Sequence, residues 1–553
     1  MITADLAGLL DGHLRRRPEA VACRTAVAVT YEELARLVDD TAAALRRTGV
    51  RAGTRTVVLV PPGPDLLAVV FALLRLRAVP VVVDPGLPPG QLRSCLAEAA
   101  PEVFIGIPLA QFARVVFGWG RGSVRTSITV GPRRLWLGTR PHRPRTPGCD
   151  PVYEPGRADD MALLAYTSGS TGPPKGVPLR RRHLLPLLRM LSDSAAIGPG
   201  TRMLSTFPPF AMAAPLLGAT VVCPDIDPRR LDRASPAVLV DDIRRHGVGA
   251  LFAAPALLDR LARYCRAREL VLDSLNVVLT AGAPLSPAAL DRVRGFLKPQ
   301  AVAYSVYGAT ECMPVSTIGC GELAATAAAT NSGAGTCLGS PLEDAQVRVI
   351  AVSDEPIDRW SDDLLVAPGT VGEITVTSPA VSDPYLHRPD ATALARIADG
   401  DQVVHRMGDL GTIDAQGRLW FAGRKAERVR TEHGDWYTDH VEPIFNTVPG
   451  VHRTALVGVG AAPAQRPVLV VEPDHGTSRR ERARIRADLL ALAQQQPHTA
   501  GLDDVLFHRR FPMDVRHHSK IRRHVLAAWA AHRLKASDRR THPDDLTGDG
   551  GAR

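Results

Sequence analysis

The chain has 553 residues, of which 45% are hydrophobic and 22% are charged. This balance is typical of a globular protein, and it excludes a chain disordered throughout, a collagen-like fibre and a small disulfide scaffold. The formal net charge is +10, but the basic runs are short and aromatic residues make up only 5%, which argues against a nucleic-acid-binding surface.

No apolar stretch is long enough to span a bilayer. The best run covers residues 66–74 and ends at Arg75, whereas a spanning helix needs about 20 residues. The first residues lack the cationic start and apolar core of a signal peptide. The eight cysteines are scattered, and no pair has the C-x-x-C spacing of a zinc or redox site. We therefore expect free thiols and a cytoplasmic location.

The first third of the chain alternates strand-like and helix-like segments. Apolar runs at 54–62, 79–86 and 102–107 predict buried strands. The segments 65–77 and 91–101 between them predict helices, the first with its apolar stripe on one side. Such alternation predicts a parallel sheet with helices on its faces.

The same pattern resumes from Met161 to about Leu279. Before it, residues 118–158 are rich in Gly, Pro and Arg and predict a loop or an irregular insertion. Residues 320–336 are small and polar and predict a second loop. From about Thr336 onward, short strands separated by turn residues predict a β-rich part.

A new unit begins near Arg424. Strands at 451–460, 468–473 and 505–510 and a helix at 479–495 predict a small α+β module. The residues from 534 onward are polar and contain Pro, Gly and Asp, which predicts a disordered tail. The fold class predicted is therefore α/β, with a β-rich subdomain and a small C-terminal α+β domain.

The sharpest local motif is TSGSTGPPKG at residues 167–176. It follows an apolar run and precedes a helix-like stretch, so we expect a turn between a strand and a helix whose backbone N–H groups, hydroxyls and lysine hold phosphates. It is not a Walker A loop, because the lysine follows Pro174. The alternative is an ordinary Gly/Ser surface turn. The expected phosphate-binding residues are Thr167, Ser168, Gly169, Ser170, Thr171, Gly172 and Lys175.

This motif resembles the phosphate-binding signature of the adenylate-forming superfamily, which includes acyl-CoA synthetases, luciferases and peptide-synthetase adenylation domains. Four further motifs agree in that family's order: TAGAP at 280–284, YGATE at 307–311, RMGDLG at 406–411 and GRKAERV at 423–429. The resemblance covers about residues 10–530. It implies an N-terminal adenylation (AMP-binding) domain at 1–422, a mobile C-terminal domain at 423–533 and a disordered tail at 534–553.

The resemblance also implies ATP and Mg²⁺ as cofactors and a role for each motif. Glu311, the implied metal ligand, and Thr310 would help to hold Mg²⁺ and phosphate, since a hard cation prefers carboxylate oxygens. Tyr307 would stack on adenine, while Asp409 and Arg424 would bind the ribose. For Asp409 and Arg424 the alternative is a solvated ion pair on a surface hairpin. The remaining nucleotide-binding residues implied are Gly282, Ala283, Pro284 and Gly308.

In this family a lysine of the C-terminal domain enters the site and contacts the carboxylate and the α-phosphate. The segment FPMDVRHHSKIRR at 511–523 points to Lys520, with Ser519 in place of the usual glycine. The resemblance thus implies Lys520, Glu311 and Thr167 as catalytic residues. The alternative for this segment is a basic, solvated face.

Some details depart from thioester-forming members. Ala211 follows Phe210 where an aromatic residue followed by His is usual, and Gly434 is shifted by one position. These departures, together with VYGATECMPVS and FPMDVRHHSKIRR, resemble the β-lactone synthetases of olefin and β-lactone natural-product biosynthesis. That group adenylates a 3-hydroxy acid, here expected to be a 2-alkyl fatty acid. The substrate's own hydroxyl then closes a β-lactone and releases AMP.

Two alternatives stay open. The chain could be a fatty acyl ligase that delivers its product to CoA or to a carrier protein, or an inactive adenylate-fold protein that serves as a scaffold or sensor. Intact Lys175, Glu311, Asp409 and Lys520 argue against the inactive form. The expected partners are the small-molecule acid, ATP and other enzymes of the same pathway.

Overall fold

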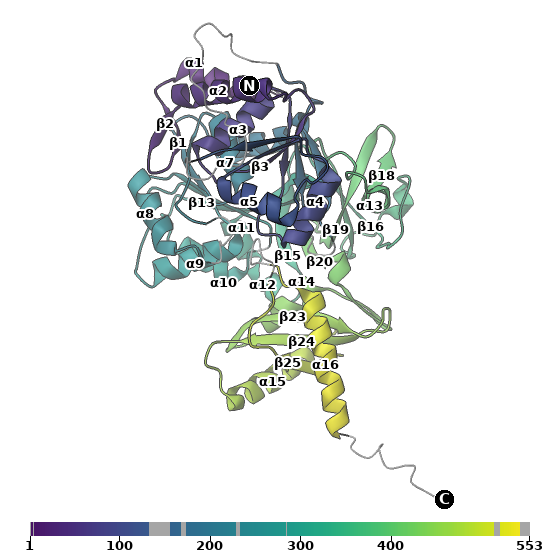
Figure 1. Ribbon diagram of the computed structural model, residues 1–553. Coiled ribbons are helices and arrows are strands. Elements are labelled where there is room, and N and C mark those ends of the chain that lie inside the picture. The colour runs from purple at the N-terminus through teal and green to yellow at the C-terminus, as the bar shows by residue number, and fades with distance from the viewer. Residues whose placement is uncertain are drawn as a thin grey trace, which may run out of the picture.

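The computed structural model describes residues 2–3, 5–131, 155–167, 173–227, 233–283, 285–513 and 520–541. It has a large part built on two extended sheets and a smaller C-terminal part that lies below it in Figure 1. The described helices are α1 Leu6–Arg16, α2 Tyr31–Arg47, α3 Pro64–Arg75, α4 Pro89–Ala99, α5 Pro108–Phe117, α6 Leu185–Arg189, α7 Pro208–Leu216, α8 Pro236–His246, α9 Pro255–Arg266, α10 Pro287–Arg294, α11 Cys320–Ala325, α12 Ala327–Asn331, α13 Pro389–Ala395, α14 Thr438–Phe445, α15 Arg479–Ala493 and α16 Arg523–Thr541.

The first sheet has six strands in the order β6-β5-β3-β4-β7-β8. All neighbours are parallel except β7 and β8, which form an antiparallel pair. The parallel pairs connect through helices such as α3 and α4, as crossover connections require. The strands are β3 Arg55–Leu59, β4 Val79–Val82, β5 Val103–Gly106, β6 Thr126–Thr129, β7 Met161–Tyr166 and β8 Gly176–Arg180.

The second sheet has fourteen strands in the order β16-β17-β19-β20-β15-β14-β13-β12-β11-β9-β10-β1-β2, with β18 paired to β19. It is parallel from β1 to β13 and antiparallel from β13 to β16. The strands are β1 Val21–Arg24, β2 Ala28–Thr30, β9 Arg202–Ser205, β10 Thr220–Val222, β11 Ala250–Phe252, β12 Val277–Ala281, β13 Val302–Ala309, β14 Cys312–Gly319, β15 Thr336–Pro341, β16 Gln346–Ile350, β17 Gly372–Thr377, β18 Arg396–Asp399, β19 Gln402–Ile413 and β20 Leu419–Arg424.

The C-terminal unit, residues 429–513 and 520–541, has its own sheets and apolar cores. A small hairpin pairs β21 Val429–Thr431 with β22 Gly434–Trp436. A three-stranded sheet joins β23 Val451–Val459, β24 Arg466–Pro473 and β25 Asp504–Phe507. The predicted α/β class, the β-rich part after Thr336 and the α+β elements of this unit are confirmed.

Helix α3 differs from its prediction. The pattern indicated one apolar stripe, but every residue from Leu66 to Arg75 is buried, because α3 packs inside the main core. Its one buried charge, Arg75, forms ion pairs with Asp11 and Asp39. A buried guanidinium is tolerated when carboxylates neutralise it in this way.

Two loop predictions and the predicted start of the C-terminal tail were wrong in part. Residues 320–336 contain helices α11 and α12, since an Ala-rich run has high helix propensity whatever its polarity. Strand β6 lies inside the stretch 118–158 that was expected to be irregular, and residues 132–154 of that stretch lie outside the described part. Helix α16 continues through Leu534 to Thr541, past the point where the tail was expected to begin.

The motif TSGSTGPPKG also lies in a different setting from the one expected. It joins β7 to β8, so it is the connection of an antiparallel hairpin and not a strand-to-helix turn. The residues after Lys175, GVPLR, are apolar enough to form a buried edge strand before the next helical segment begins. Among the described helices, none is long and apolar enough to cross a membrane.

Candidate active site

The candidate residues come together where several strands of the second sheet end. Strands β12 and β13 are parallel neighbours, so their carboxyl ends lie at one edge of the sheet, where α/β proteins place ligands. Gly282 and Ala283 follow β12 directly, and Tyr307 lies near the end of β13. Thr310 and Glu311 form the turn from β13 to β14. Pro284 lies outside the described residues.

Asp409 is the most buried acidic group among these candidates, with 2% of its surface exposed. It lies on β19 directly opposite Arg424 on β20. The hydroxyl of Tyr307 donates a hydrogen bond to Asp409 Oδ2 at 2.7 Å. Arg424 Nη1 lies 3.0 Å from Asp409 Oδ1, an ion-pair contact that lacks the geometry of a hydrogen bond.

Burial governs the electrostatics of this group. It raises the pKa of the Asp409 carboxyl, while the positive charge of Arg424 and the hydrogen bond from Tyr307 favour the charged form. Burial and the neighbouring carboxylate also raise the pKa of the Tyr307 hydroxyl, so this hydroxyl stays protonated. Asp409 Oδ1 is buried and has no hydrogen-bond partner among the described residues. It is thus an acceptor that a ligand hydroxyl can satisfy.

Lys520 reaches this group from the C-terminal unit. Its positive charge lowers the pKa of Asp409 and so opposes the effect of burial. Lys520 directly precedes Ile521, which forms an antiparallel β-bridge with Met513. Residues 514–519, including Ser519, lie outside the described part. The structure therefore brings the lysine and the aspartate of two distant motifs into electrostatic contact.

Arg523 anchors the same segment and was missed by sequence reasoning. Its guanidinium pairs with Glu427, within the GRKAERV motif, at 2.9 Å and with Glu442 on α14 at 2.7 Å. Burial raises the pKa of Glu442 to about 7 even though Arg523 opposes this shift. The three side chains tie the start of α16, and with it Lys520, to the segment after β20.

Glu311 lies in a second group of polar side chains. The hydroxyl of Tyr385 donates a hydrogen bond to Glu311 Oε1 at 2.7 Å. The ammonium of Lys175 lies 4.7 Å from the centre of the Tyr385 ring, a cation–π contact. Burial lowers the pKa of His405 to about 4, although Glu311 favours its charged form. This group therefore combines a carboxylate, a lysine and a neutral imidazole.

Tyr385 and His405 were not singled out from the sequence. Tyr385 comes from the segment between β17 and α13, and His405 from β19, so neither stands next to Glu311 along the chain. The only signal available was that His405 directly precedes the RMGDLG motif.

Two hydrogen bonds join Thr167 to Lys175, on either side of the undescribed residues of the phosphate-binding motif. The amide of Thr167 donates to the carbonyl of Lys175 at 3.1 Å, and the amide of Lys175 donates to Thr167 Oγ1 at 3.2 Å. These bonds explain why a hydroxyl residue suits position 167. The predicted residues Ser168, Gly169, Ser170, Thr171 and Gly172 lie outside the described part.

Gly308 is required by close packing. A Cβ atom at this position would lie 2.8 Å from the carbonyl oxygen of Cys312. The glycine thus allows the turn that carries Thr310 and Glu311 to fold back against β13.

Two charged motif residues serve the fold instead of the site. Arg406 and Lys425 both bind the buried carboxylate of Glu373, with Arg406 Nη2 at 2.6 Å and Lys425 Nζ at 2.9 Å. This network fixes β19 and β20 relative to β17, and therefore fixes Asp409 opposite Arg424.

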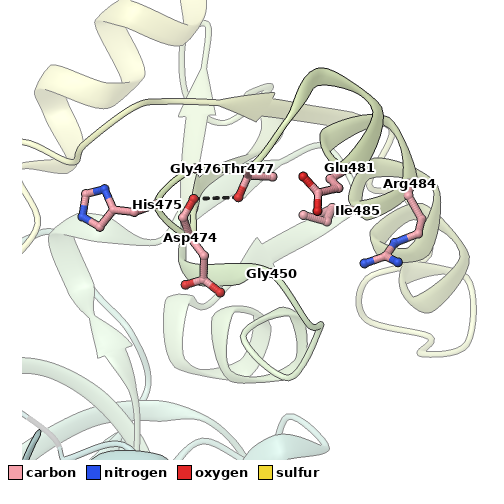
Figure 2. Close-up of a pocket in the computed structure, with 8 residues that line it drawn as sticks. All are labelled: Gly450, Asp474, His475, Gly476, Thr477, Glu481, Arg484 and Ile485. Carbon is pink, nitrogen blue, oxygen red and sulfur yellow. Dashed lines mark hydrogen bonds between the residues drawn. The ribbon is translucent and has the colours of Figure 1, made fainter.

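A pocket in the C-terminal unit is separate from these groups. Figure 2 shows it at the start of α15, where the hydroxyl of Thr477 donates to the carbonyl of Asp474 at 2.6 Å. None of the candidate residues lines it. Its lining residues are Gly450, Asp474, His475, Gly476, Thr477, Glu481, Arg484 and Ile485.

The family model for AMP-binding enzymes matches residues 10–386. The chain belongs to the AMP-binding enzyme family. Two curated relatives carry the name olefin beta-lactone synthetase. The one from Stenotrophomonas maltophilia is 45% identical over 96% of this chain and 99% of its own length. The one from Xanthomonas campestris pv. campestris is 43% identical over 95% of this chain and 97% of its own length.

A solved structure confirms the fold. The amide bond synthetase McbA from Marinactinospora thermotolerans superposes with a TM-score of 0.80 at 23% identity, over 95% of this chain and 99% of that protein. The two olefin beta-lactone synthetases are thus much more similar in sequence to this chain than this structural relative.

Proposed function

We propose that this chain is an ATP- and Mg²⁺-dependent β-lactone synthetase. It adenylates a 3-hydroxy acid and cyclises it to a β-lactone, with release of AMP and pyrophosphate. The observation that carries the proposal is the 43% and 45% identity to two olefin beta-lactone synthetases over nearly the whole chain. The grouping of Tyr307, Asp409, Arg424 and Lys520 supports it, because these residues come from separate motifs of an adenylate-forming enzyme.

The reaction has two steps. First, a carboxylate oxygen of the acid attacks the α-phosphorus of ATP, a P–O bond forms and pyrophosphate leaves. Second, the 3-hydroxyl oxygen attacks the carbonyl carbon, the C–O bond of the ring forms, AMP leaves and the hydroxyl proton is lost. The second attack is intramolecular, and the proximity of hydroxyl and carbonyl lowers its barrier.

In the first step each residue group has a separate task. The free Oδ1 of Asp409 accepts a hydrogen bond from a ribose hydroxyl, and Arg424 keeps the carboxylate charged. Lys520 donates to the oxygens that carry negative charge as the P–O bond forms. Thr167 and Lys175 hold the phosphate loop closed at its base. Tyr307 stacks on the adenine while its hydroxyl remains bonded to Asp409.

Glu311 fits a role as the protein's ligand to Mg²⁺. No group of three or more His, Cys, Asp or Glu side chains in the described ranges is arranged to hold a metal alone. A magnesium ion that takes one carboxylate, the phosphates and waters needs no such group. When bound, Mg²⁺ neutralises the charge of the polyphosphate.

The C-terminal domain, residues 423–533, carries Lys520 and is proposed to move between the two steps. Its separate core and its link through Glu427, Glu442 and Arg523 suit a unit that rotates as a body. Rotation would withdraw Lys520 once the adenylate has formed. The substrate is proposed to be a 2-alkyl fatty acid in the cytoplasm, supplied by other enzymes of the same pathway.

The nucleotide product tests the proposed reaction class. With a 3-hydroxy acid, ATP should be converted to AMP and pyrophosphate. The reason is that the segment 167–176 connects two antiparallel strands and is not a Walker loop, and that Asp409 and Arg424 stand in motifs of adenylate-forming enzymes. Chromatography of the nucleotides from a reaction with labelled ATP measures this directly. ADP as the main nucleotide product would refute the assignment.

Glu311→Gln should raise the Mg²⁺ concentration needed for half-maximal adenylation by about tenfold or more. The change keeps the shape of the side chain but removes its negative charge, and a charged contact of this kind contributes about 1.5–3 kcal/mol. Titration of Mg²⁺ in the ATP–pyrophosphate exchange assay gives the value. Glu322→Gln, on the exposed side of α11, is the matched control. An unchanged titration would assign the metal to another carboxylate.

Tyr385→Phe should have a smaller effect in the same direction. The variant loses the hydrogen bond to Glu311 but keeps the ring that faces Lys175, so the half-maximal Mg²⁺ concentration should rise severalfold. Tyr264→Phe on α9 serves as the control, since Tyr264 contacts only Arg268 among the cation–π pairs described. An effect equal to that of Tyr264→Phe would show that Tyr385 does not position Glu311.

A further inference from the structure

Helix α5 exposes apolar side chains to solvent and buries the polar side chain of Gln111. Leu109, Phe112, Val115 and Val116 are 56–60% exposed. At 100° per residue these four positions fall within about a third of the helix circumference. Gln111, which lies outside this arc, is fully buried. A surface helix ordinarily has the reverse arrangement, so this apolar face requires an explanation.

Specific contacts hold α5 in this orientation. Gln111 Nε2 donates to the carbonyl of Ile128 on β6 at 2.8 Å, and Ser127 Oγ donates to Gln111 Oε1 at 2.6 Å. The guanidinium of Arg114 lies 5.7 Å from the centre of the Phe104 ring. Rotation of the helix to bury its apolar face would break these specific bonds. The exposed face is therefore built into the fold.

The segment of chain that contains α5 carries charge of one sign. From residue 103 to residue 149 the sequence contains no Asp or Glu, but it contains eight arginines. Of these, Arg121 and Arg125 are described and exposed, close after α5 in the chain. Glu102 and Asp150, which bound the stretch, are its nearest acidic residues in sequence. An anionic partner would meet no acidic side chain from this segment.

We propose that α5 docks this protein on the surface of an anionic lipid membrane. The Leu, Phe and Val side chains on one face of α5, in a segment whose charged residues are all arginines, fit the pattern of helices that lie in the membrane interface. A protein partner would more commonly be met by charges of both signs, which fix the register of the two chains. Figure 1 shows α5 beside α4 in the large part of the molecule, away from the C-terminal unit, so docking leaves that unit free.

Flotation with vesicles tests the proposal on the full-length protein. Vesicles of phosphatidylcholine mixed with phosphatidylglycerol should carry the protein upward, and vesicles of phosphatidylcholine alone should carry much less. The double variant F112D/V116D should lower the partition coefficient by roughly tenfold or more, because two apolar side chains no longer enter the lipid. The control is Val27→Asp. Val27 is 68% exposed and lies outside α5, so this variant should bind the mixed vesicles as tightly as the parent does.

Substitution of Arg121 and Arg125 tests the electrostatic part of the proposal independently. R121Q/R125Q should lower binding to the mixed vesicles by about fivefold per arginine and should leave binding to phosphatidylcholine alone unchanged. ATP–pyrophosphate exchange should be unchanged in every variant, because none of the substituted residues belongs to the candidate site. If F112D/V116D fails to fold, Phe112→Ser takes its place, with the same direction expected.

Three outcomes would overturn the proposal. The parent protein could remain at the bottom of the gradient with both vesicle types. The α5 variants could bind as tightly as the parent. Light scattering could show that the parent protein forms a dimer, or a complex with another protein, and that F112D/V116D abolishes this association. If lipid binding also stayed undetectable, the apolar face of α5 would be a protein interface.

Discussion

Lys520→Ala is expected to slow adenylation by about two to three orders of magnitude while ATP binding stays close to that of the parent. The lysine is proposed to stabilise negative charge that develops as the P–O bond forms, and loss of such a donor commonly costs about 3–4 kcal/mol. ATP binding should survive because Asp409, Tyr307 and Arg424 remain in place. Single-turnover formation of acyl-adenylate and calorimetry of ATP binding measure the two quantities.

The matched control for this prediction is Lys535→Ala. Lys535 lies on α16, the helix that follows Lys520, and its side chain is exposed. Its substitution should therefore not change the rate of adenylation. If Lys520→Ala stayed within about threefold of the parent, Lys520 would not be the catalytic lysine. The C-terminal unit would then have to act without closing over the site.

A 3-deoxy acid is expected to stall the enzyme after one equivalent of pyrophosphate per site. It can be adenylated, since its carboxylate is intact, but it has no hydroxyl to attack the carbonyl. The acyl-adenylate should therefore accumulate on the enzyme, and steady turnover should be lost. Burst measurement of pyrophosphate, followed by mass spectrometry of the bound species, reports both results.

CoA separates the two leading functions in the same experiment. Because Ala211, a buried side chain with no functional group, stands where thioester-forming relatives usually have His, we expect no rescue by CoA. The matching 3-hydroxy acid, which should turn over, is the control. Rapid CoA-dependent turnover of the deoxy acid, with thioester as the product, would make the chain an acyl-CoA ligase.

Much of the fold could be predicted from the sequence because local pattern and tertiary role agree. The strands and helices of residues 54–107 and the α+β elements after Val451 follow their hydrophobic periods closely. Helix α3 shows the limit of this reasoning. Its sequence predicts an amphipathic helix because it contains Arg75, but two aspartates that are distant in the chain neutralise this arginine and allow it to be buried. Strand β8 was missed because the phosphate-binding motif was expected to lead directly into a helix, whereas the residues after Lys175 pair with β7.

The site was predictable only where a motif supplies the residue. Asp409 and Arg424 stand in two motifs, and the structure places them opposite each other on paired strands. Tyr385 contacts Glu311, which is 74 residues away in the chain, and Arg523 contacts Glu427, which is 96 residues away. No periodic pattern in the sequence relates positions so far apart. The exposed apolar face of α5 could not be predicted either, because an amphipathic pattern ordinarily indicates that the apolar face packs against the core.

The proposal that this chain forms a β-lactone without a thiol acceptor is best tested by mass spectrometry of the product. The enzyme is incubated with a racemic 2-alkyl-3-hydroxy fatty acid, ATP and Mg²⁺ but no CoA. We expect catalytic turnover to a compound lighter than the acid by one water, with the infrared carbonyl band of a four-membered lactone and one AMP per product. Recovery of unchanged acid, or product formation only after CoA or a carrier protein is added, would contradict it.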